Sequence, residues 1–399
     1  MSETLYRPRQ GSVPLTDSEQ KYQECLREYR SPGEYVAFDT ERASGIRYQD
    51  KAYLIQAKGQ SAPLSLLDPL ALPELSDFSA ACKNSTWVLH AAKEDLECME
   101  WAGLQAPHLF DTQIAAKLLG KTQVGLGPLT EDVLGVKLAK NHTRENWSRR
   151  PLKQSWLDYA ALDVEYLVEL AVALKKQLVA AGRLPWAEQE FAYTLTHYRR
   201  QSDPEPWRHL KGAGKAKSPQ QLGLLRELYY QRDQIAKERD LAPSRVLPNR
   251  DLIDLVLKTP HSYQELSKRP FASRPQLRRH CRRWWQAIKK VRGLPSKQLP
   301  GKAPLRRLHE IASVATWEKI DPARAELYRT LKQNVSTWAQ ENQVWAEFAL
   351  SPSATRQVAA YWEPGKDLQT LLETAEARNW QIEHFLPRFE DLCTVWAKE

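Results

Sequence analysis

Two carboxylates, Asp39 and Glu41, end a seven-residue stretch that begins at Tyr35 and whose first half is apolar and β-prone. Because turn residues precede it at 31–33, the sequence predicts a core strand that finishes in two acids. Side chains two apart on a strand point to one face, about 7 Å from each other. Such acids repel each other unless a cation lies between them, and their hard oxygens suit Mg²⁺ or Mn²⁺. Asp-x-Glu alone is more often a solvated strand end, so a site requires further acids.

Three further residues of the right type follow along the chain. Asp95 falls at the start of a predicted helix, where the helix N-terminus favours a carboxylate. Tyr159 and Asp163 are four apart in a helix predicted from 153 to about 181, so they share one face. Carboxylates that converge on two metal ions support an in-line phosphoryl displacement, in which a water is activated and the leaving oxygen is stabilised.

In this order the acids resemble the three exonuclease motifs of the DEDD family, in its Tyr-containing subgroup. The short sequence motifs around these residues resemble the bacterial ribonuclease D family more closely, and they cover most of residues 35–170. These words are Phe38-Asp39-Thr40-Glu41, Leu54-Ile55-Gln56, Leu89-His90-Ala91, Glu94-Asp95-Leu96, Phe110-Asp111-Thr112-Gln113, Arg150-Pro151-Leu152 and Asp158-Tyr159-Ala160-Ala161-Leu162-Asp163-Val164.

The resemblance implies a ribonuclease H-like α/β fold with a mixed sheet flanked by helices, two divalent metal ions, and removal of nucleotides from RNA 3′ ends. It assigns four metal ligands, namely Asp39, Glu41, Asp95 and Asp163. It places Tyr159 at the attacking water, and because an ordinary tyrosine has a pKa near 10, we expect positioning rather than proton removal. Trp156 departs from the pattern, since many members have Gln there, and this leaves the support of Tyr159 open.

A loop ahead of the catalytic helix carries Arg144, Arg149 and Arg150 around Trp147. It fits a phosphate clamp with a stacking surface, or equally a solvated loop. Two other residues of the motifs, His90 and Asp111, are predicted to be structural, His90 at the sheet rim and Asp111 as a helix cap.

The elements that must position these side chains follow from the apolar pattern. Strands come first and helices later, which predicts an α/β or α+β domain of about 200 residues. With the resemblance above, we expect the exonuclease domain over residues 1–205. A helix is expected at 94–103. Strands are predicted at 35–41, 52–56, 63–67, 87–90 and 108–110, the second and third of them antiparallel neighbours.

Charge gathers in the middle of the chain. Residues 201–310 carry 25 Lys and Arg against 10 Asp and Glu, a net of +15, whereas the whole chain is +9. A basic block of this kind is usually a polyanion contact, with a solvated surface as the alternative. Its words 241–247 and 259–266 resemble the helicase-and-RNase-D C-terminal (HRDC) module, expected over 217–294. The residues expected to contact a phosphate backbone there are Arg278, Arg279, Arg282, Arg283 and Trp284.

Residues 305–399 predict a second helical, HRDC-like domain, mildly acidic, that braces the others or shapes an RNA channel. No apolar run approaches the roughly 20 residues that span a bilayer, and the first 20 residues lack a signal-peptide core. Five scattered cysteines argue against disulfides and a zinc site. We therefore expect a cytoplasmic monomer with no membrane contact and no organic cofactor.

The expected function is a metal-dependent 3′→5′ exoribonuclease that acts on structured RNA 3′ ends such as transfer RNA precursors. The substrate rests on the resemblance alone. A 3′→5′ DNA exonuclease of the same fold stays open, because hydrolysis does not itself require a 2′-hydroxyl. A nucleic-acid-binding protein with a silent catalytic domain is the other alternative, although every motif position is filled.

Overall fold

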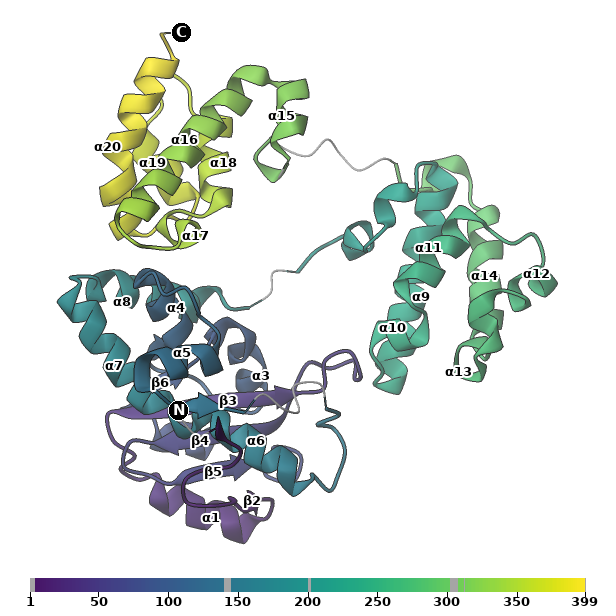
Figure 1. Ribbon diagram of the computed structural model, residues 1–399. Coiled ribbons are helices and arrows are strands. Elements are labelled where there is room, and N and C mark those ends of the chain that lie inside the picture. The colour runs from purple at the N-terminus through teal and green to yellow at the C-terminus, as the bar shows by residue number, and fades with distance from the viewer. Residues whose placement is uncertain (1–3, 140–144, 200–201, 302–307, 312, 399) are drawn as a thin grey trace.

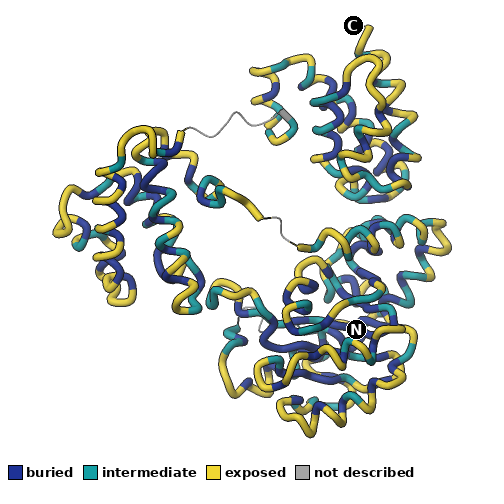
Figure 2. Tube along the Cα trace, turned by 180° about the vertical axis from the view of Figure 1, so that it is seen from behind, coloured by how far each residue is buried: buried dark blue, intermediate teal, exposed yellow. Residues whose placement is uncertain are grey.

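The computed structural model describes residues 4–139, 145–199, 202–301, 308–311 and 313–398. Figure 1 shows three bodies along the chain. We call them the N-terminal unit (residues 4–199), the middle unit (202–301) and the last unit (308–398). Figure 2 shows the buried residues of the N-terminal unit gathered along its strands.

A six-stranded mixed sheet forms the centre of the N-terminal unit and runs in the order β2-β5-β4-β3-β6-β7. β3 pairs antiparallel with β4 and parallel with β6. The bounds are β2 (Leu15–Thr16), β3 (Tyr35–Arg42), β4 (Ala52–Gly59), β5 (Leu64–Leu67), β6 (Thr86–Leu89) and β7 (Leu109–Asp111), with β1 (Thr4–Leu5) and β8 (Lys137–Leu138) in a separate pair. The predicted mixed α/β sheet is confirmed. The two-residue strands β1, β2 and β8 were not predicted, because two residues are too few to show an apolar pattern.

Helices cover both faces of this sheet. On one face Phe38 of β3 meets Phe78 with ring centroids 6.2 Å apart. The opposite face is covered by α6 over β3, β4 and β5, and by α7 over β3 and β6. The bounds are α1 (Glu19–Glu28), α2 (Ser76–Ala81), α3 (Leu96–Trp101), α4 (Thr112–Leu118), α5 (Leu126–Leu134), α6 (Gln154–Glu165), α7 (Leu167–Ala180) and α8 (Leu184–His197).

The helix predicted over 153–181 is two helices, because the chain breaks at Tyr166 (φ −115°, ψ 6°). The backbone carbonyl of Glu165 accepts a hydrogen bond from the Lys58 ammonium. The Tyr166 ring lies 4.2 Å from the Arg9 guanidinium. Contacts with distant parts of the chain therefore stabilise the break between the two helices. No Gly or Pro occurs there, so the local sequence does not indicate it.

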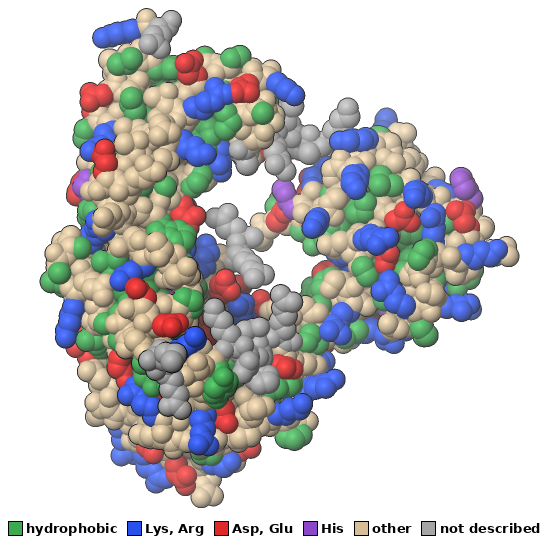
Figure 3. Space-filling view, in the orientation of Figure 1, with side chains coloured by type: hydrophobic (Ala, Val, Ile, Leu, Met, Phe, Trp, Pro, Cys, Tyr) green, Lys and Arg blue, Asp and Glu red, His purple; other side chains and the backbone are tan. Residues whose placement is uncertain are grey.

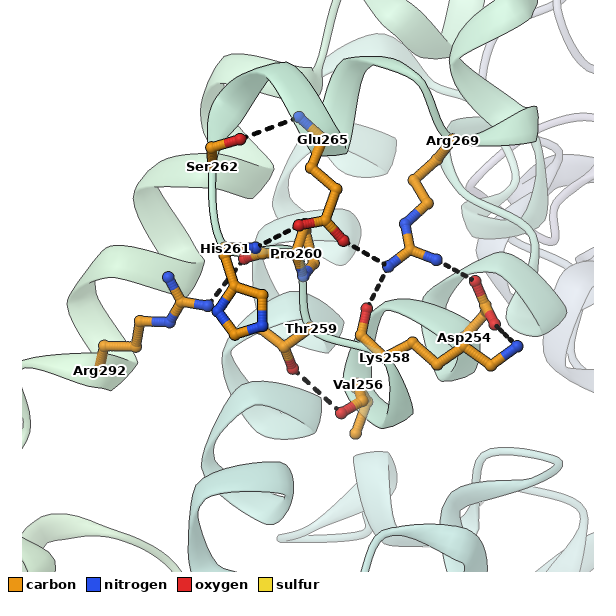
Figure 4. Close-up of polar contacts among 10 residues, drawn as sticks. All are labelled: Asp254, Val256, Lys258, Thr259, Pro260, His261, Ser262, Glu265, Arg269 and Arg292. Atoms are coloured by element: carbon orange, nitrogen blue, oxygen red, sulfur yellow. Dashed lines mark hydrogen bonds and ion pairs between the residues drawn. The ribbon is translucent and has the colours of Figure 1, made fainter.

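The middle unit is all helical around a core of its own. Its α11–α12 junction is closed by Glu265, which accepts from the backbone N–H of His261 at 2.7 Å while its own N–H donates to Ser262 (Figure 4). The bounds are α9 (Pro219–Arg239), α10 (Pro243–Val246), α11 (Asn249–Leu257), α12 (Tyr263–Ser267), α13 (Pro275–Arg278) and α14 (Cys281–Arg292).

The last unit is also all helical and shares a continuous apolar core with the N-terminal unit. Trp186 of α8 stacks on Trp380 with centroids 4.8 Å apart. Glu190 of α8, 4% exposed, accepts from Arg378 at 2.7 Å. The bounds are α15 (Val314–Ile320), α16 (Pro322–Glu341), α17 (Ala346–Ala349), α18 (Pro352–Tyr361), α19 (Leu368–Thr374) and α20 (Asn379–Trp396).

Across the described ranges, none of the helices combines the length and the apolar character needed to cross a membrane. All five cysteines are buried free thiols.

Candidate metal centre and active site

Asp39 and Glu41 lie near the end of β3 and face α6. The register pairs Asp39 with Gln56 and Glu41 with Leu54 on β4, and Leu54 packs in one cluster with residues of α6. A β-bulge follows between Glu41 and Arg42, a feature that often re-aims side chains beside active sites. α6 brings Asp163 to the same place, so that carboxylate oxygens of the three acids lie within 4.8 Å of one another.

Burial and mutual repulsion oppose full ionisation of this trio. Burial, then the charge of Asp95, raises the pKa of Asp39 well above its ordinary value. Burial, then Asp163, does the same to the pKa of Glu41. Burial raises the pKa of Asp163 itself to about 7. Because the donors are carboxylate oxygens without His or Cys, the set fits hard divalent ions such as Mg²⁺ or Mn²⁺.

Asp95 lies beside the trio rather than within it. It is the residue before α3, is 6% exposed, and accepts a hydrogen bond from the Thr40 hydroxyl at 2.7 Å. The Arg42 Nε is 4.0 Å from its carboxylate. Burial nevertheless raises the pKa of Asp95 to about 6. Its role as a ligand stays a prediction, although its charge reaches both Asp39 and Asp163.

Tyr159 lies one turn before Asp163 and is hydrogen-bonded to its carboxylate. Burial and the nearby acids raise the Tyr159 pKa far above 10, so the hydroxyl holds its proton at neutral pH. Trp156 is buried, and its ring lies 5.5 Å from that of Trp147.

The structural interpretations of Asp111 and His90 agree with the contacts observed. The Asp111 carboxylate caps α4 and also accepts from the backbone N–H groups of Ala91 and Ala92, at 3.1 and 2.7 Å. Ala91 has a left-handed backbone (φ 60°), so Asp111 holds the turn that leads into Asp95. His90 contacts the Thr112 hydroxyl through Nδ1 at 2.9 Å.

The proposed clamp at Arg150 is wrong. Its guanidinium makes two bonds of 2.6 Å to the buried Asp68 carboxylate and one each to the Tyr53, Trp147 and Arg149 carbonyls. All five of its N–H donors are therefore used within the protein. Trp147, 1% exposed, offers no stacking surface. Arg149 is exposed and stays a candidate, whereas Arg144 lies outside the described residues.

Trp284 is also wrong as a nucleic-acid contact, because it is 0% exposed. α14 buries Cys281, Trp284, Ile288 and Val291, whose helical spacing forms its core face. The four arginines predicted beside it are all exposed, and Figure 3 shows Lys and Arg side chains spread over the middle unit. Arg283 is partly neutralised by Glu238 at 3.1 Å.

Sequence reasoning missed how the β3–β4 loop joins the middle unit. Tyr48 donates to Asp233 through its hydroxyl (3.1 Å) and to Asp240 through its backbone N–H (3.2 Å). Residues of both units line an open pocket of about 860 Å³, among them Arg42 and Lys211. Tyr48 and Asp240 are 192 residues apart in sequence, and no local pattern signals such pairing.

Comparison with known proteins agrees with this architecture. Residues 13–179 match a 3′–5′ exonuclease family, residues 221–288 the HRDC domain, and residues 311–392 a "3′ to 5′ exonuclease C-terminal domain". Ribonuclease D of Haemophilus influenzae is 32% identical over 75% of this chain and 78% of its own. Alignments with three other curated ribonuclease D proteins span 66%, 67% and 61% of those proteins, about two thirds of their length.

Solved structures extend the likeness over the whole chain. A Bifidobacterium adolescentis protein superposes with a TM-score of 0.88 and 30% identity, covering 100% of both chains. Escherichia coli RNase D, described as "an exoribonuclease involved in structured RNA processing", gives 0.71 and 25% identity over 96% of this chain and 98% of its own. The fold is that of a hydrolytic 3′–5′ exonuclease, and the cluster of Asp39, Glu41 and Asp163 is compatible with that activity. More specifically, the chain belongs to the ribonuclease D family of exoribonucleases.

Proposed function

We propose that this protein removes nucleotides from RNA 3′ ends with two divalent metal ions, Mg²⁺ or Mn²⁺, held by Asp39, Glu41, Asp95 and Asp163. The observation that carries this is the trio of carboxylates within 4.8 Å of one another, whose pKa values burial and mutual charge raise. Such a set gains more from binding cations than a solvated acidic patch does.

The residues divide the work as follows. Asp39, Glu41, Asp95 and Asp163 would hold the divalent ions, which would lower the pKa of a water and stabilise the leaving 3′ oxygen. Water attacks the terminal phosphodiester, the bond from phosphorus to the 3′ oxygen breaks, and a nucleoside 5′-monophosphate leaves. Tyr159 positions the attacking water through its hydroxyl, because its raised pKa keeps the hydroxyl protonated at neutral pH and so unable to accept a proton from the water. The hydrogen bond from the Thr40 hydroxyl fixes the direction of the Asp95 carboxylate.

The substrate we propose is structured RNA, including transfer RNA precursors. The description of the E. coli relative supports this class. So do the exposed Arg278, Arg279, Arg282 and Arg283, which suit a phosphate backbone more than one base sequence. Buried free cysteines support a reducing, cytoplasmic setting, and we expect a monomer.

The test uses 5′-labelled stem-loop RNA with a single-stranded 3′ tail, the same sequence as DNA, and Mg²⁺, Mn²⁺ or EDTA. The proposal expects a ladder shortened from the 3′ end, release of nucleoside 5′-monophosphates, and no cleavage in EDTA. The Asp163→Asn protein serves as the inactive control. Internal cuts, or cleavage that persists in EDTA, would contradict the mechanism. Faster cleavage of the DNA would replace the substrate class with the alternative, a DNA exonuclease.

A further inference from the structure

Gln56 lies directly across from Asp39 in the β3–β4 ladder. Paired residues of antiparallel strands point to the same face, with Cβ atoms about 4.5–5.5 Å apart. That face is the one under α6, because Leu54, two residues before Gln56, packs with α6. Lys58, two residues after it, lies 3.8 Å from the carboxylate of Glu165 at the end of α6. Gln56 is therefore a neighbour of the carboxylate trio in the layer between sheet and helix.

The amide of Gln56 is buried without a use in the fold itself. The side chain is 0% exposed. Neither Nε2 nor Oε1 has a hydrogen-bond partner among the residues that the structure describes. A buried primary amide with its donors and acceptor unsatisfied is unfavourable, and an aliphatic side chain of similar size would pack there at less cost. The amide thus requires a role beyond the packing of sheet and helix.

Side-chain donors contact two of the four acids, Asp95 and Asp163, and they indicate where that role lies. Asp95 accepts from the Thr40 hydroxyl, and Asp163 is hydrogen-bonded to Tyr159. For Asp39, the favourable contact is the backbone N–H of Thr40, set against the charges of three other acids. Within the described site, Asp39 lacks a side-chain donor, and the unpartnered amide stands on the adjacent strand.

We propose that Gln56 is the positioning residue for Asp39, and this rests on the function proposed above. Its Nε2–H donates to the Asp39 oxygen that faces away from the ions when the carboxylates close on them. Outer partners of this kind fix the orientation of a ligating carboxylate, and their loss typically costs about 10- to 100-fold in metal affinity or activity.

The experiment compares Gln56→Leu with a matched control in the last unit. Gln381 is also 0% exposed, but its amide donates to the Phe348 carbonyl at 2.8 Å and accepts from the Arg378 N–H at 3.0 Å. Three measurements are made: Mn²⁺ binding by calorimetry without RNA, kcat on a dinucleotide, and the melting temperature without metal. We expect Gln56→Leu to lose about 10- to 100-fold in Mn²⁺ affinity and kcat while its melting temperature holds or rises. Gln381→Leu should show the reverse, a lower melting temperature with unchanged Mn²⁺ affinity and kcat.

Mn²⁺ affinity and kcat of Gln56→Leu within about twofold of the parent protein would overturn the proposal. A fall in melting temperature with both values unchanged would also overturn it, because Gln56 would then be structural. If Gln56→Leu does not fold, Gln56→Met, unbranched like Gln, takes its place with the same expectations. A parent protein that binds Mn²⁺ but cleaves no RNA would defeat the proposed function, whereas the effect of Gln56 on Mn²⁺ affinity would still be measurable.

Discussion

At the scale of the residue, Asp39 and Asp163 place like charges where their own burial opposes ionisation. Replacing either by Asn removes a metal ligand charge while keeping the shape of the side chain. We expect Asp39→Asn and Asp163→Asn to lower kcat more than the roughly 100-fold seen for outer partners, with folding and RNA binding retained. Normal turnover by either protein in saturating Mg²⁺ would remove that residue from the metal centre.

The Tyr159 hydroxyl makes a different contribution. It is hydrogen-bonded to Asp163 but supplies no charge, so Tyr159→Phe should leave the Mg²⁺ dependence nearly unchanged. Loss of a positioning contact should reduce kcat by about 10² to 10⁴. The measurement is single-turnover cleavage over a Mg²⁺ titration. An unchanged kcat would show that other groups place the water.

Proton competition gives the metal centre a pH dependence. Burial raises the pKa of Asp163 to about 7 and that of Asp95 to about 6. Without bound metal, the stability contributed by these two carboxyls is present below the unfolded value of about 3.8 and is lost as the pH rises through 6 to 7. Ions must displace those protons, so Mn²⁺ affinity should rise from pH 6 to pH 8 with proton release. Calorimetry in two buffers of different ionisation enthalpy measures this, and a flat affinity would contradict it.

At the scale of the element, α13, the turn after it and α14 carry four exposed arginines. Neutralising Arg278, Arg279, Arg282 and Arg283 together should reduce the slope of log K against log salt by about 0.7 per lost contact on single strands. Because Arg283 already forms an ion pair with Glu238, we expect the slope of log K against log salt to fall by about 2 to 3 in total. Turnover of a saturating short oligonucleotide should persist.

The control for that variant neutralises four exposed cations of the last unit, where we expect no change of slope. These are Lys319, Lys332, Arg388 and Lys398. Salt titrations of binding to a folded stem-loop RNA compare both proteins with the parent. If plots of log K against log salt have the same slope for the parent and the α13–α14 variant, the four arginines do not contact RNA and belong to a solvated surface.

What the sequence could predict also divides by element. The acid-bearing strand and the helix of Asp163 follow from local periodicity and motif spacing, and both were found. Trp284 could have been excluded, because Cys281, Ile288 and Val291 already mark its helical face as apolar. The bend at Tyr166 and the Asp68 contact of Arg150 depend on partners far along the chain, which no window of local sequence contains.

At the scale of the whole molecule, the N-terminal and last units meet at Gly120, whose backbone is left-handed (φ +67°). A Cβ there would overlap the Gln343 carbonyl, and nearby Trp345 donates to the Lys121 carbonyl at 2.8 Å. Gly120→Ala should therefore undock the last unit, lower the melting temperature and expose that unit to protease.

Gly135 provides the matched control for this prediction. It has a similar φ of +71°, and no atom lies within 4 Å of the place that a methyl group would take. Gly135→Ala therefore carries the backbone cost of about 1–2 kcal/mol alone. For a unit of this size that is a fall of a few degrees in melting temperature, about 2–4 °C per kcal/mol. Equal effects of the two substitutions would mean that docking at Gly120 adds nothing to stability.

The stacking of Trp186 on Trp380 and the bond from the Trp380 ring to Glu190 also set an order of events at the ribosome. The two sides of that second contact are 190 residues apart. At about 5–20 residues per second, α8 is synthesised roughly 10–40 s before Trp380, the residue of the last unit that packs on it. All four acids precede α8, so a nascent chain completes its catalytic sheet while an apolar face still waits for residues to be translated. Translation pauses in this interval would prolong the time for which the nuclease has all four acids in place while the apolar face of α8 is still exposed to solvent.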